Sequence, residues 1–75
     1  MDRGPLLKIL TDMKGTFKEL DLVIAGDATP VEIRNVVDVE DLRGNKVIKV
    51  VTRQNFIWID PEHVAVAYQV RTDGH

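Results

Sequence analysis

The first twenty residues carry an apolar stripe with helical spacing. Its members recur at i, i+3, i+4 and i+7, which is the period of one helix face. They are Leu6, Ile9, Leu10 and Met13. Pro5 suits the first helical position, and Gly15 suits the position just past the end. This pattern predicts a helix over residues 5–14.

Beyond the helix, the chain is a series of short apolar segments separated by turn residues. Apolar and polar side chains alternate from Val31 to Glu40, as in a strand with one face toward a core. Asn35 interrupts the alternation, and a polar residue within an inward face indicates a bend or bulge. The predicted strands are residues 20–25, 31–40, 46–53, 56–59 and 64–70, with a hairpin connection at 41–46 and a corner at 60–63.

Together these elements predict a mainly β protein, with an N-terminal α-helix and a five-stranded, strongly bent antiparallel small barrel. Seventy-five residues allow one domain at most, residues 1–75, and we expect residues 71–75 to be a short disordered tail.

This order of elements resembles the small β-barrels of the Sm-like and Src-homology-3-like type. The Sm-like type is the closer one, because that family also starts with a helix and ends with a strand, a turn and a strand. Residues 31–40 lack the glycine that the family carries in its second strand, and His63 alone matches the Tyr-Lys-His signature of its bacterial RNA chaperones. The resemblance therefore implies the fold and does not by itself imply RNA binding.

Composition argues against catalysis. The chain contains no Cys and no Ser, so the two commonest side-chain nucleophiles are absent. His63 next to Asp60 and Glu62 is interpreted as a surface turn residue, because catalysis needs a second positioned group and a pocket. We expect no enzyme activity and no cofactor. A cytoplasmic location is the expectation, since no apolar run approaches the length of a membrane span.

No metal site is expected either. Asp38, Glu40 and Asp41 form an acidic run without the ligand spacing of a calcium loop. A solvated strand end is the simpler interpretation, and pairing with the basic hairpin of a neighbouring subunit is another.

The segment 56–59 is apolar at every position, so the pattern does not tell which of its side chains face the core. Side chains alternate across a strand, so Phe56 and Trp58 point to one side and Ile57 and Ile59 point to the other. Only one of these two pairs can face the core. One pair must be covered by the helix or exposed for a partner. The leading hypothesis is a non-catalytic interaction module that self-associates or docks a partner protein through an aromatic and alanine surface. That surface comprises Phe56, Trp58, Tyr68, Ala65 and Ala67.

The alternative hypothesis is an Sm-like nucleic-acid (RNA) binding protein that uses a basic hairpin. Four basic residues lie close together with no acidic residue between them, and aromatic residues follow at once. They are Arg43, Lys46, Lys49 and Arg53. Basic side chains beside exposed aromatics can follow a nucleic-acid backbone and stack bases. The net charge of −2, from 10 basic and 12 acidic residues, weakens this alternative.

Overall fold

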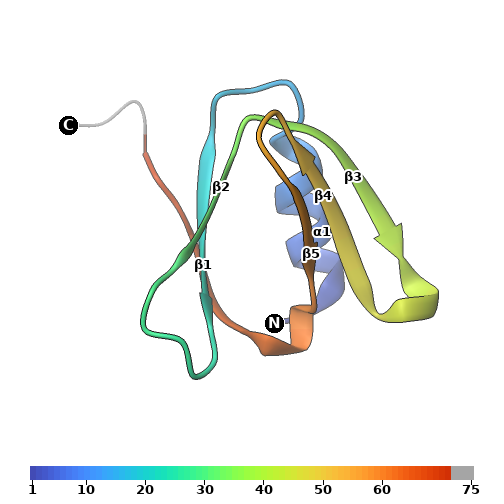
Figure 1. Ribbon diagram of the computed structural model, residues 1–75, viewed down its shortest axis with the longest axis vertical. Helices are drawn as coiled ribbons and strands as arrows, with labels where there is room; N and C mark the ends of the chain where they lie inside the picture. The colour runs from blue at the N-terminus through green and yellow to red at the C-terminus, as the bar shows by residue number, and fades with distance from the viewer. Residues whose placement is uncertain (72–75) are drawn as a thin grey trace.

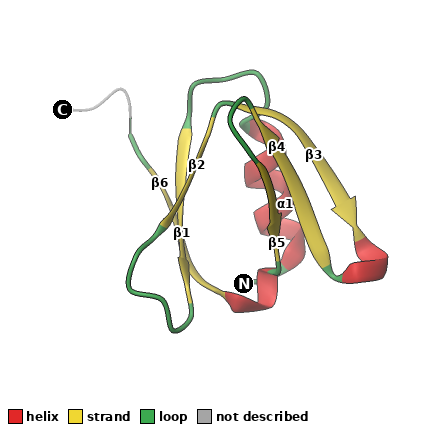
Figure 2. Cartoon of the chain, viewed as in Figure 1, coloured by secondary structure: helices red, strands yellow, loops and turns green. Residues whose placement is uncertain are grey.

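The computed structural model describes residues 1–71 and consists of one helix and six strands in two antiparallel sheets (Figures 1 and 2). The regular elements, in chain order, are α1 Arg3–Asp12, β1 Glu19–Ile24, β2 Val31–Arg34, β3 Val36–Leu42, β4 Val47–Thr52, β5 Phe56–Ile59 and β6 Val64–Gln69. Short 3₁₀ helices, η1 Arg43–Asn45 and η2 Pro61–His63, join β3 to β4 and β5 to β6.

The two sheets have the orders β2-β1-β6 and β3-β4-β5. The second sheet is a meander of neighbours in sequence, whereas the first joins β1 near the start of the chain to β6 near its end. No strand ladder among residues 1–71 connects the two sheets, so the sheets are not closed and the predicted barrel is not confirmed. The chain passes from the first sheet to the second between β2 and β3.

This crossing lies at Asn35, where the sequence indicates a bend. Asn35 has a φ of 56°, in the left-handed region that Asn tolerates better than most residues. Its backbone turns out of the first sheet, and its carbonyl accepts a hydrogen bond from the Arg53 amide (3.1 Å). The predicted strand 31–40 is therefore two strands, and the prediction of five strands becomes six.

The core lies between the two sheets and the helix, and α1 and every strand contribute to it. Its members are aliphatic or methionine side chains: Leu6, Leu10, Met13, Leu20, Leu22, Ile33, Val36, Ile48, Val50, Ile59 and Val64. Figure 1 shows α1 behind the second sheet, and its closest strand is β3. The helix therefore packs on its own chain.

The helix begins two residues before the predicted position and ends two residues earlier. Gly15 follows it with a φ of 72°, a conformation that needs no Cβ, and its amide donates to the Val36 carbonyl (3.0 Å). This bond fixes the end of the helix against the start of β3. Residues 1–71 contain no helix long and apolar enough to cross a membrane. Apart from Arg71, the predicted tail lies outside the described residues.

Candidate interaction surface

The outward side of the second sheet carries two exposed aromatic side chains. Inward residues of β5, Ile57 and Ile59, pack on the core, with Ile59 buried. Because side chains alternate across a strand, Phe56 and Trp58 point outward, with exposed fractions of 64% and 58%. The structure therefore shows which of the two pairs faces the core, which the apolar pattern of the sequence left open. We call the outward side of β3, β4 and β5 the aromatic face.

Lys49 of β4 lies beside both rings. It is the cross-strand partner of Trp58, and Val51 is the partner of Phe56. The Lys49 Nζ lies 5.1 Å from the Phe56 ring centroid and 5.7 Å from that of Trp58. The rings themselves are 6.4 Å apart at 38°. These are cation–π and aromatic-pair distances, so the three side chains form one ordered unit.

Acidic residues of β3 border this unit. Glu40 is the cross-strand partner of Lys49, and their charged atoms are 3.7 Å apart. Asp38 pairs with Lys14, two residues past the end of α1 (3.3 Å). A backbone hydrogen bond from Val39, and then Lys14, hold the pKa of Asp38 below its usual range. The predicted acidic run is therefore engaged mainly with cations of its own chain.

Asp41 shows the same behaviour at the far end of β3. It forms ion pairs with Arg3 of the helix and with Arg43 of η1, the latter at 2.8 Å. The Arg43 hydrogen bond is the largest cause that lowers the pKa of Asp41, and the Arg3 charge adds to it. Asp41 therefore joins the helix to the β3–β4 connection.

The four basic residues of the alternative hypothesis do not form a continuous strip. Arg43 and Lys46 lie at the η1 end of β4, and Arg53 lies just past its opposite end. Lys49, between them in sequence, belongs to the aromatic face. Arg43 and Lys49 are already paired with Asp41 and Glu40. Carboxylates thus lie among the cations that would meet a phosphate backbone.

The structure separates the residues of the predicted aromatic and alanine surface. Tyr68 lies on β6 in the other sheet, opposite Asp21. Ala67 packs against the core, and Ala65 is the extra residue of a bulge in the β1–β6 ladder. Only Phe56 and Trp58 share a face. Phe17, which was not among the candidates, is the most exposed aromatic residue at 81%.

His63 lies in η2, where Asp60 organises the corner. The Asp60 carboxylate accepts a hydrogen bond from the Glu62 amide (3.0 Å) and lies 3.5 Å from His63 Nε2. Both contacts are local, and the His63 side chain is exposed. The corner has the geometry of a capped turn, as the sequence interpretation expects.

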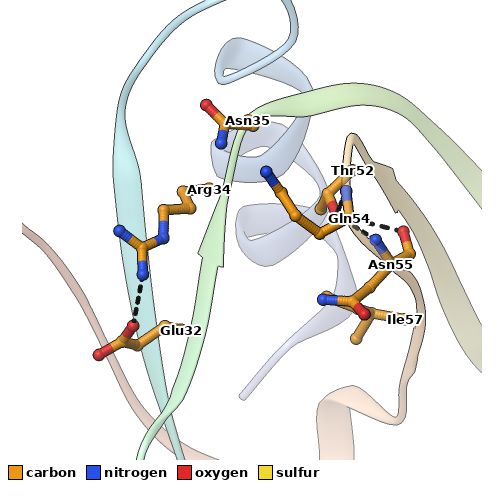
Figure 3. Close-up of a pocket in the computed structure, with 7 residues that line it drawn as sticks. All are labelled: Glu32, Arg34, Asn35, Thr52, Gln54, Asn55 and Ile57. Atoms are coloured by element: carbon orange, nitrogen blue, oxygen red, sulfur yellow. Dashed lines mark hydrogen bonds and ion pairs between the residues drawn. The ribbon is translucent and has the colours of Figure 1, made fainter.

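A polar hollow lies beside the crossing at Asn35 (Figure 3). Its volume is about 400 Å³. It is bordered on one side by Glu32, Arg34 and Asn35, and on the other by the β4–β5 turn with Gln54 and Asn55. Thr52 fixes that turn, because its hydroxyl accepts hydrogen bonds from the Gln54 and Asn55 amides (3.2 and 2.8 Å). The hollow is open, and its polar side chains come from β2, the bend at Asn35 and the β4–β5 turn.

No family model matches the chain, and no curated protein or solved structure is significantly similar to it.

Proposed function

We propose that this protein is a non-catalytic interaction module that self-associates through the aromatic face. One observation carries the proposal: all four aromatic residues of the chain are exposed, while the core is made of aliphatic and methionine side chains. Aromatic side chains bury the largest apolar areas and usually dominate cores and interfaces. Since the core uses none of them, an interface is the place where Phe56 and Trp58 gain most from burial.

A second copy of the chain is the partner that the face fits best. It carries a cation, Lys49, and carboxylates, Asp38 and Glu40, side by side. In a two-fold symmetric dimer the same surface of each copy is in contact, so Lys49 of one copy can lie near Glu40 of the other. A small domain also has little core of its own, and self-association is one of the usual remedies.

The test uses light scattering over a range of concentrations, together with the fluorescence of Trp58, the only Trp of the chain. We expect a dimer whose Trp58 emission shifts to shorter wavelength as concentration rises. Trp58→Ser should give a monomer with unchanged circular dichroism. Tyr68→Ser removes an exposed aromatic from the other sheet and should leave the dimer intact.

The opposite pattern would overturn the proposal. A wild-type monomer at every concentration excludes self-association and leaves docking of a different protein. Association that survives Trp58→Ser but is lost in Tyr68→Ser assigns the interface to the other sheet. Association through buried apolar surface should also survive high salt.

Single-stranded nucleic acid is the second candidate ligand. It is favoured by the exposure of Phe56 and Trp58 beside Lys49, which is the arrangement of a base-stacking platform. It predicts quenching of Trp58 by an oligonucleotide, steeply weakened by salt, and loss of binding when Lys49 and Arg53 become Glu. The carboxylates of Asp38 and Glu40 on the same face make it the weaker candidate.

We further propose that the two sheets are halves of a small barrel of the Sm-like or Src-homology-3-like type. The order of elements supports this assignment, with β2 and β3 as one strand bent at Asn35 and η2 as the turn before the last strand. We also propose a cytoplasmic location for the module.

A further inference from the structure

Three carboxylates meet on the outward side of the first sheet, away from the aromatic face. Glu19 and Asp21 alternate with the buried Leu20 and Leu22 on β1, so both point outward. Glu32 is the cross-strand partner of Asp21 on β2. One carboxylate oxygen from each residue lies within 4.8 Å of those from the other two.

Asp21 is the unusual member of this cluster. Its exposed fraction is only 9%, and among the described residues its Oδ1 has no hydrogen-bond donor. Leaving a buried polar group unpaired costs free energy, and more so for a carboxylate. A hydrogen-bond donor or a cation next to Asp21 would therefore stabilise its carboxylate.

The groups around Asp21 act on the cluster in opposite directions. Partial burial raises the pKa of Glu19, and the nearby Asp21 carboxylate adds to the effect. Arg34 reaches Glu32 (3.2 Å) and lies 3.9 Å from Glu19. Its guanidinium thus compensates the two outer carboxylates, and no contact from it to Asp21 is seen.

We propose that Glu19, Asp21 and Glu32 bind a divalent cation, and that Ca²⁺ is preferred. All three ligands are carboxylate oxygens, which suit hard cations. Two oxygens bound to one ion can be separated by at most twice the metal–oxygen distance. All three oxygens lie within 4.8 Å of one another, which fits Ca²⁺ at about 2.3–2.6 Å per bond. The flexible coordination of Ca²⁺ suits ligands on two strands better than the near-ideal octahedron that Mg²⁺ demands.

The experiment is a calorimetric titration of the metal-free chain with CaCl₂ and, separately, with MgCl₂ at neutral pH. We expect saturable binding of one Ca²⁺ per chain with a Kd on the order of 1 mM or below, and weaker binding of Mg²⁺. Ca²⁺ should also raise the melting temperature, because it binds only the folded arrangement of strands.

Variants locate the site. Asp21→Asn and Glu32→Gln should each weaken Ca²⁺ binding by at least about tenfold, the scale seen when a metal site loses support. Asp38→Asn, in the acidic run of the other sheet, is the matched control and should change the affinity less than about twofold. Asp21→Asn should also leave the metal-free protein at least as stable, because it removes a buried charge. Glu32 is exposed, so Glu32→Gln tests the site even if Asp21→Asn fails to fold.

Two results would overturn the proposal. One is the absence of saturable heat with CaCl₂ at concentrations well above 1 mM, which would mean that the cluster holds a proton instead. The other is binding that is lost in Asp38→Asn and retained in Glu32→Gln, which would place the cation on β3.

Discussion

The Nζ of Lys49 lies 5.7 Å from the centroid of the Trp58 ring, and the two residues face each other across β4 and β5. We expect Lys49→Met, which keeps the apolar stem and removes the charge, to lower the free energy of unfolding by about 0.5–1 kcal/mol. Urea denaturation followed by circular dichroism measures this change. Glu40→Gln is the control, because it removes the ion pair and leaves Lys49 over the rings. An equal loss in both variants would assign the effect to the ion pair.

The bend at Asn35 gives a second prediction. A side chain with a Cβ and no local hydrogen bonding is disfavoured at a φ of 56°, so Asn35→Ala should lower the free energy of unfolding by about 1–2 kcal/mol. Asn35→Gly should be close to neutral, since Gly adopts this conformation freely. Lys46, with a φ of 58°, is the matched position, and Lys46→Gly should stabilise the protein. Equal denaturation midpoints for Asn35→Ala and Asn35→Gly would show that the bend does not depend on φ.

Asp41 makes stability depend on pH. Because Arg43 and Arg3 lower its pKa in the folded protein, Asp41 binds its proton more weakly there than in the unfolded chain. Its stabilising contribution is complete above the unfolded pKa of about 3.9 and is lost as pH falls through the lower, folded value. Urea midpoints measured from neutral to acidic pH should therefore drop below about pH 4, and less steeply in Asp41→Asn. Asp27→Asn, in the β1–β2 loop, should retain the wild-type profile; if Asp41→Asn does so as well, the ion pairs are not responsible.

Because α1 packs on its own chain, shortening one of its buried side chains should strongly lower the free energy of unfolding. Leu10 is completely buried, so Leu10→Ala should lower the free energy of unfolding by about 2–5 kcal/mol. Because small domains have little stability to lose, we expect extensive unfolding at ambient temperature, visible as lost circular dichroism. Lys8→Ala, on the exposed side of the helix, is the control. A folded Leu10→Ala variant of nearly wild-type stability would mean that the helix contributes little to the core.

Periodicity and turn residues were sufficient to predict most elements. The bounds of β5 are as expected, and the helix, the hairpin and the corner before β6 lie within a few residues of their predicted positions. Asn35 was identified as a bend because it places a polar residue in an apolar row. Such signals are local, and each depends on a few neighbouring side chains.

Features that depend on long-range pairing were not predictable in the same way. The aromatic face was undecided because both alternate pairs of 56–59 are apolar, and only the position of the core selects one. The cluster of Glu19, Asp21 and Glu32 requires knowing that β1 pairs with β2 in one register. Asp21 inside the apolar segment Leu20–Ile24 was the available signal, since a charge is out of place there.

The contrast between the two sheets has a consequence for how the chain acquires its structure. β3, β4 and β5 pair only with neighbours in sequence, whereas β1 pairs with β6 across most of the chain. Closing a long loop costs more entropy than closing a hairpin, and non-local pairing slows folding. The β3–β4–β5 meander is therefore expected to form early. During synthesis, β1 cannot complete this pairing until β6 has left the ribosome.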